Sequence, residues 1–96
     1  DIWLDRRLAQ LHANPTFWTA ARDLRLVTAL ARGDGIAAAA EACGVESADA
    51  RSRWGQLRAA AQPDAPSGPM RLDSQARLLR ALRARAEPPA EEETDA

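Results

Sequence analysis

The 96-residue sequence predicts an all-α fold, and three observations support this assignment. Apolar residues recur three or four positions apart through most of the chain, which is the spacing of one helix face. Glycine and proline gather between these periodic segments, and no segment of strand length alternates polar with apolar residues. Alanine, which favours helices more than it adds buried area, occurs 23 times. We therefore expect a tri-helical helix-turn-helix core, extended by an N-terminal helix and a C-terminal amphipathic helix.

The first two helices are expected over residues 2–13 and 20–32. Proline disfavours helical geometry in the residue before it, so Asn14-Pro15 ends the first helix. Thr19 is a favourable N-cap for the second helix, and the glycines of Gly33-Asp34-Gly35 end it. The residues expected to face the core are Leu4, Leu8 and Leu11, with Trp3 beside them, from the first helix and Leu24, Val27, Leu30 and Ala31 from the second.

A helix-turn-helix is predicted between Gly35 and Leu57. Residues 36–43 form a short Ala-rich helix, Gly44-Val45 a turn, and Ser47 caps a second helix over 48–61. In the second helix an apolar stripe at i, i+4 and i+7 is buried, and polar side chains are left outside. The stripe consists of Ala50, Trp54 and Leu57, and the outer side chains are Arg51, Arg53, Gln56 and Arg58.

The remainder of the chain divides into three parts. Residues 62–71 are a Pro-rich linker or extended loop, and residues 72–86 form an amphipathic helix that begins near Asp73 or Ser74. Its apolar face, formed by Leu72, Leu78, Leu79, Leu82 and Ala86, is opposed by Arg77, Arg80 and Arg83. That face packs on the first helices of the same chain, or it contacts a protein partner or a second copy. Residues 87–96 are expected to be a disordered acidic tail.

The charge of the chain is unevenly distributed. Residues 87–96 contain five acids and no base, so residues 1–86 carry 13 arginines against nine acids and a net charge of +4. A basic body of this kind favours an acidic partner such as nucleic acid. The chain is thus expected to consist of four parts, which are a helix-turn-helix domain over 1–61, a Pro-rich linker over 62–71, a basic amphipathic helix over 72–86 and an acidic tail over 87–96.

Short motifs in the first part resemble a known class of modules. Trp18-Thr19, Asp23-Leu24 and Arg53-Trp54 resemble the Myb/SANT class of homeodomain-like tri-helical domains. The spacing from Gly44-Val45 to Trp54 and Leu57 is also similar to that of GcrA-type bacterial regulators. The resemblance covers roughly residues 17–61, and it implies an ion pair between Asp23 and Arg53.

Two sets of residues follow from these patterns. The expected structural core of the module consists of Trp18, Leu24, Val27, Ile36, Ala40, Val45, Trp54 and Leu57. The expected DNA-binding residues are Arg51, Ser52, Arg53, Gln56 and Arg58. Relatives that read bases carry Lys or Asn on the outer face of this helix, whereas this chain has Ala48 and Asp49 there, preceded by Glu46. We therefore expect little base specificity.

The leading functional hypothesis is a small non-enzymatic protein that binds double-stranded DNA. Such a protein acts in transcription regulation or as the DNA-recognition subunit of a small-terminase-like packaging complex. The alternative is a SANT-type protein-interaction module that does not bind DNA. In that case Glu41, Glu46 and Asp49 face a basic or helical partner.

Other functions lack support in the sequence. No nucleophile with a base, acid dyad or Gly-rich phosphate loop indicates an enzyme, and no cofactor is expected. His12 has no second ligand at metal-binding spacing, so no metal site is predicted. The single cysteine, Cys43, is expected to be a buried filler and fits a reducing cytoplasm, and no apolar run is long enough for a membrane span.

Overall fold

The computed structural model describes residues 2–13 and 17–86 of the chain. The described residues form α1 (Ile2–Leu11), α2 (Ala20–Ala31), α3 (Ile36–Cys43), α4 (Ser47–Ala61) and α5 (Leu72–Ala86), with no strand among them. The all-α assignment is therefore confirmed. The acidic tail and the Asn14-Pro15 helix stop, both predicted from the sequence, lie outside the described residues.

The ends of the helices follow from local backbone chemistry. The Thr19 hydroxyl accepts a hydrogen bond from the backbone N–H of Arg22 at 3.2 Å, which confirms it as the N-cap of α2. Gly33 and Gly44, at φ +102° and +74°, take the left-handed geometry that ends α2 and α3. Ser47 was expected to cap α4, but it is the first helical residue, and Glu46 occupies the cap position without a side-chain bond.

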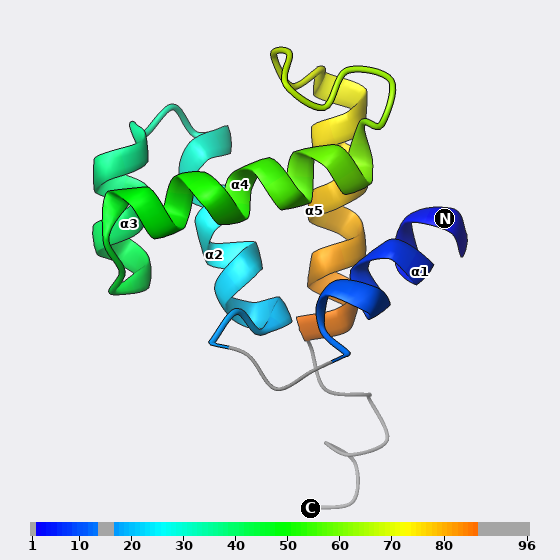
Figure 1. Ribbon diagram of the computed structural model, residues 1–96, viewed down its shortest axis with the longest axis horizontal. Helices are drawn as coiled ribbons and strands as arrows, with labels where there is room; N and C mark the ends of the chain where they lie inside the picture. Colours follow the sequence, from blue (N-terminus) through cyan, green and yellow to red (C-terminus); the bar gives the residue numbers. More distant parts are fainter. Residues whose placement is uncertain (1, 14–16, 87–96) are drawn as a thin grey trace, which may run out of the picture.

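The five helices pack as a tri-helical unit with two further helices beside it (Figure 1). Helices α2, α3 and α4 pack on one another, and α4 passes across α2 and α5. The most extensive contact between helices joins α2 to α5, and α1 packs against both α4 and α5. The N-terminal and C-terminal helices are thus part of one packed body with the helix-turn-helix.

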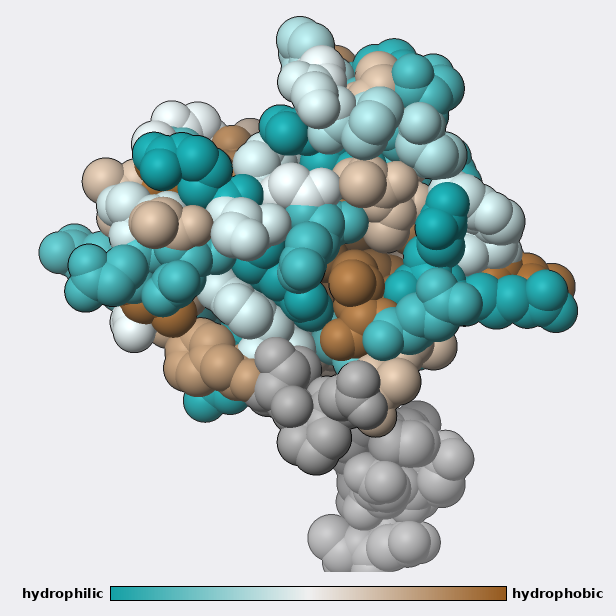
Figure 2. All heavy atoms as spheres, viewed as in Figure 1, coloured by the Kyte–Doolittle hydropathy of each residue, from teal (hydrophilic) through white to brown (hydrophobic). Residues whose placement is uncertain are grey.

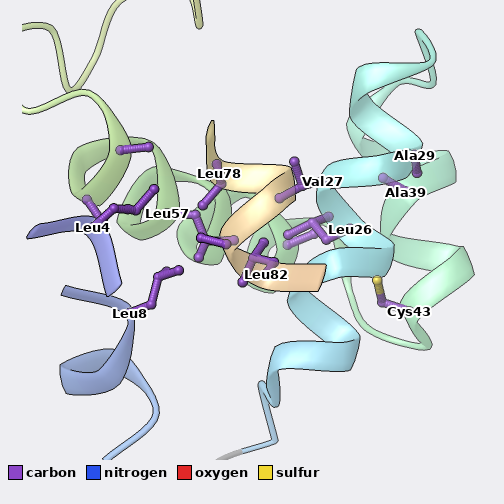
Figure 3. Close-up of a cluster of buried hydrophobic side chains, with 14 of the residues drawn as sticks. Leu4, Leu8, Leu26, Val27, Ala29, Ala39, Cys43, Leu57, Leu78 and Leu82 are labelled. Carbon is purple, nitrogen blue, oxygen red and sulfur yellow. The ribbon is translucent and has the colours of Figure 1, made fainter. Parts of the chain in front are cut away.

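One continuous core connects all five helices (Figure 3). Of the predicted core residues, Val27, Ala40 and Leu57 are fully buried. The other five, which are partly buried and pack against this core, are Trp18, Leu24, Ile36, Val45 and Trp54. Trp3 was expected in the core, but it is 42% exposed. The Arg7 guanidinium lies over its ring, 4.8 Å from the centroid, so this indole is covered by a charged side chain and not by the core.

The apolar face of α5 is buried within the same chain. Leu78 and Leu82 are completely buried and Leu79 partly, because α5 packs against α2 and α4. Leu72 lies at the start of the helix and is 81% exposed. The interpretation of these four leucines as a surface for a partner or a second copy was therefore wrong for Leu78 and Leu82.

The Pro-rich segment 62–71 is an ordered loop organised by one buried side chain. The amide nitrogen of Gln62 donates to the carbonyl oxygens of Ala65 and Pro69, at 2.9 and 3.0 Å. Its amide oxygen accepts from the backbone N–H of Arg71 at 2.9 Å. Because Gln62 is fully buried and all of these groups are satisfied, the segment sets the position of α5 relative to α4.

Candidate functional site

The turn between α3 and α4 brings three carboxylates to one place on the surface. The backbone N–H of Gly44 donates to the carbonyl of Glu41 at 3.1 Å, and that of Val45 donates to Ala40 at 3.0 Å. These bonds close α3 and direct the chain into α4. As a result Glu41 on α3, Glu46 before α4 and Asp49 in the first turn of α4 surround the turn, and all three are exposed.

Arg53 and Asp23 form a buried ion pair between α4 and α2. The Nε and Nη2 atoms of Arg53 donate to Oδ1 and Oδ2 of Asp23 at 2.8 and 2.7 Å. Arg53 is 5% exposed and Asp23 is completely buried. His12, at the end of α1, adds a third contact, since its Nε2 lies 2.7 Å from Asp23 Oδ2. The ion pair implied by the Myb/SANT resemblance is therefore present.

This geometry corrects the prediction that Arg53 contacts DNA. The buried stripe of α4 includes Ala50, Arg53 and Leu57, spaced at i, i+3 and i+7, and Trp54 lies at its edge. The prediction from the sequence assumes that every arginine of this helix is on the surface, and it therefore places Trp54 at the centre of the buried stripe. The guanidinium of Arg53 donates to the carboxylate of Asp23, and its Nη1 donates to Oε1 of Gln56 at 2.9 Å. It is therefore not available to phosphate or bases.

The other expected DNA-binding residues differ in accessibility. Arg51 and Ser52 are both exposed, but only Arg51 lies on the outer face of α4, because Ser52 lies in line with Asp49 and Gln56 on another edge of the helix. Gln56 is exposed, but its amide oxygen already accepts from Arg53. Arg58 donates through Nε to the carbonyl of Pro66 at 2.6 Å, and its guanidinium lies 5.9 Å from the centroid of Trp54. Of the four outer side chains predicted for α4, only Arg51 is thus an arginine that is exposed and makes no such contact with a described residue.

A groove lies along the opposite edge of α4, between α4 and α1. Its wide end is lined by Gln10, Leu11, Phe17, Trp18, Glu41, Gly44, Val45, Glu46, Asp49, Ser52, Arg53 and Gln56. A narrower end is lined by Arg7, Gln10, Leu11, Gln56, Ala59, Ala60, Pro63 and Pro66. Because Gln10, Leu11 and Gln56 line both ends, the two ends adjoin along α1 and α4. Figure 2 shows apolar atoms on this face, between hydrophilic groups on either side.

Aromatic and apolar side chains form the wall of the wide end. Phe17 is 46% exposed, and its ring meets Trp18 edge to face with centroids 5.5 Å apart. The guanidinium of Arg22 lies 4.3 Å from the Phe17 centroid and donates to the Phe17 carbonyl, which holds this pair in place. Leu11 and Val45 are partly buried beside them. The surface is therefore preformed and partly apolar, as binding sites commonly are.

The wide end of the groove is negatively charged. Arg53 is the one basic side chain among the described residues that line it, and its charge is balanced by Asp23. Among the residues that the structure describes, none forms an ion pair with Glu41, Glu46 or Asp49. Three uncompensated carboxylates therefore surround an apolar surface, whereas Arg7 lies at the far end. Residue spacing alone did not predict this groove, because α1 joins it only through tertiary packing.

Two other reactive side chains, Cys43 and His12, both pack within the fold. Cys43 is buried and free, and burial raises the pKa of its thiol. Arg85 at the end of α5 donates through Nε toward Nδ1 of His12 at 3.3 Å, so His12 connects α5 to the buried pair. Within residues 2–13 and 17–86, no cluster of His, Cys, Asp and Glu is arranged to hold a metal ion. No described helix has the length and apolar character needed to cross a membrane.

Comparisons with known proteins do not assign a family or a function to the chain. No family model, no curated protein and no solved structure matches the chain.

Proposed function

We propose that this protein is a non-enzymatic protein-interaction module, of the SANT type suggested by the sequence, which binds a segment of another protein in the groove between α1 and α4. The observation that carries this proposal is the combination of the Phe17–Trp18 pair, of which Phe17 is exposed, with three carboxylates at the α3–α4 turn that pair with no described residue. Apolar area provides affinity, and charge at its edge selects the partner.

The same charges weigh against DNA as the principal partner. Helix-turn-helix proteins place the first turns of the second helix in the major groove. In this chain those turns carry Glu46 and Asp49, and Glu41 lies next to them. These carboxylates repel phosphate, and of the arginines on α4 only Arg51 is fully exposed. The free thiol of Cys43 fits a reducing compartment, so we place this function in the cytoplasm.

A display library of helix-forming peptides, selected against the whole chain, tests the proposal. We expect binders that are lost when Ser52→Trp fills the groove, because Ser52 is exposed in its wall and a large ring there takes the space of the partner. Ala76→Trp on the exposed face of α5 is the matched control and leaves binding unchanged. Selection of binders that are equally insensitive to both variants contradicts the proposal.

Double-stranded DNA binding is the second candidate, and one observation favours it. Arg51 is exposed on α4, and Arg80 and Arg83 are exposed on α5. Exposed arginines that contact phosphate give weak binding, with a Kd of about 10⁻⁴ to 10⁻⁶ M and strong salt dependence. It would serve transcription regulation or a packaging complex that tolerates many sequences.

Fluorescence anisotropy of a labelled duplex, at 50 and 200 mM salt, tests this second candidate. If DNA is the partner, Arg51→Ala lowers the affinity at low salt by several-fold, and Arg25→Ala, an exposed arginine on α2, has a smaller effect. If the groove is the functional site, the parent chain shows little affinity for the duplex even at 50 mM salt, and Arg51→Ala does not change it more than Arg25→Ala does.

A further inference from the structure

We propose that the occupant of the groove is an amphipathic α-helix of about three turns. One end of this helix carries positive charge and the other end carries negative charge. Its lysines or arginines lie against Glu41, Glu46 and Asp49, and a carboxylate at its other end lies against Arg7. This inference rests on the proposed function, and it specifies the chemistry of the partner.

The length of the partner follows from the wall of the groove. On α4 the groove extends from Asp49, at the wide end, to Ala60, at the narrow end. Eleven residue steps at 1.5 Å each give about 16 Å. A helix of three turns covers this distance, and it brings one end to the α3–α4 turn and the other to Arg7.

A helical partner fits better than an extended one because of hydrogen bonding. An extended peptide gains its main-chain hydrogen bonds chiefly when it is added to the edge of a sheet. The described residues contain no strand, so this surface has no edge to pair with. A helix satisfies its own backbone groups and needs only an apolar face for docking. Small residues of α4 that line the groove, Ser52, Ala59 and Ala60, leave room for a helix backbone to approach closely.

The charges of the groove determine the polarity of the partner. The wide end carries three carboxylates that no described residue neutralises, because Arg53 is balanced by Asp23. The narrow end carries the exposed guanidinium of Arg7. A helix with cations at one end and an acid at the other matches both ends at once, whereas a uniformly charged helix matches only one.

The charge pattern of peptides selected from the library tests this inference. Among binders that Ser52→Trp removes, we expect Lys or Arg at one terminal turn and Asp or Glu at the opposite turn. The triple variant Glu41→Gln, Glu46→Gln, Asp49→Asn then weakens such a peptide about tenfold, as three exposed ion pairs imply. Arg7→Gln instead removes only the preference for an acid at the other end.

A second triple variant controls for the change in overall charge. Asp34→Asn, Asp64→Asn and Asp73→Asn alter the net charge equally, but these residues do not line the groove, so we expect unchanged binding. Groove binders without this charge pattern, or without helical circular dichroism when bound, overturn the inference and leave the proposed function intact. Self-association that Ser52→Trp abolishes overturns it in favour of a second copy. If no binder depends on the groove, the proposed function itself fails.

Discussion

Replacing Asp23 with Asn is expected to lower the free energy of unfolding by about 3–5 kcal/mol. Asp23 is completely buried and accepts two hydrogen bonds from Arg53, with His12 also in contact. Asn keeps the shape but removes the charge, so the guanidinium of Arg53 stays buried without a counter-ion. A loss of this size is comparable with the total stability of a small domain. Urea denaturation followed by circular dichroism measures it.

Two further variants separate the ion pair from a general effect of mutation. Asp34→Asn, which breaks an exposed pair with Arg32, is expected to cost less than about 1 kcal/mol. The double variant Asp23→Leu, Arg53→Met removes both charges and is expected to recover much of the loss of the single variant. If Asp23→Asn alone costs under about 1 kcal/mol, the pair does not hold α2 against α4.

Replacing Leu82 with Ala is expected to cost about 3–5 kcal/mol, because it leaves a cavity in the core between α2, α4 and α5. Leu82 is completely buried within a single chain (Figure 3). The thermal midpoints of the parent chain and of this variant are therefore expected to be independent of protein concentration. Differential scanning calorimetry at two concentrations that differ twentyfold checks both statements.

Leu72 provides the matched control for Leu82. It lies on the same helix but is 81% exposed, so Leu72→Ala is expected to change the free energy of unfolding by less than about 0.5 kcal/mol. A thermal midpoint that rises with protein concentration would show that α5 is buried against another chain in solution.

The sequence contains most of the information needed for the helices and the core. Thr19, Gly33 and Gly44 mark helix ends by local chemistry, and the structure confirms all three. Apolar spacing identified Val27 and Leu57, which are buried in the core. These predictions succeed because each depends on residues within one or two helical turns.

The errors arise where distant segments meet. Periodicity assigns Arg53 to the surface, but Asp23, thirty residues away, makes a buried position favourable for it. Leu11 on α1 and Gln56 on α4 line the same groove, and no local pattern relates them. Gln62 is polar and lies in a Pro-rich segment, yet it is fully buried because three backbone groups of the loop satisfy its amide.

Amide chemical-shift mapping on the whole chain distinguishes most directly between the groove and the outer face of α4 as the functional surface. The ¹⁵N-labelled protein is titrated with a peptide selected from the library and, separately, with a DNA duplex. We expect the peptide to shift Gln10, Leu11 and Val45, which line the groove from outside α4, and the duplex to shift none of them. Shifts from the duplex at Arg51 and Arg58, with no response of Gln10 and Leu11 to the peptide, would contradict the groove as the binding site.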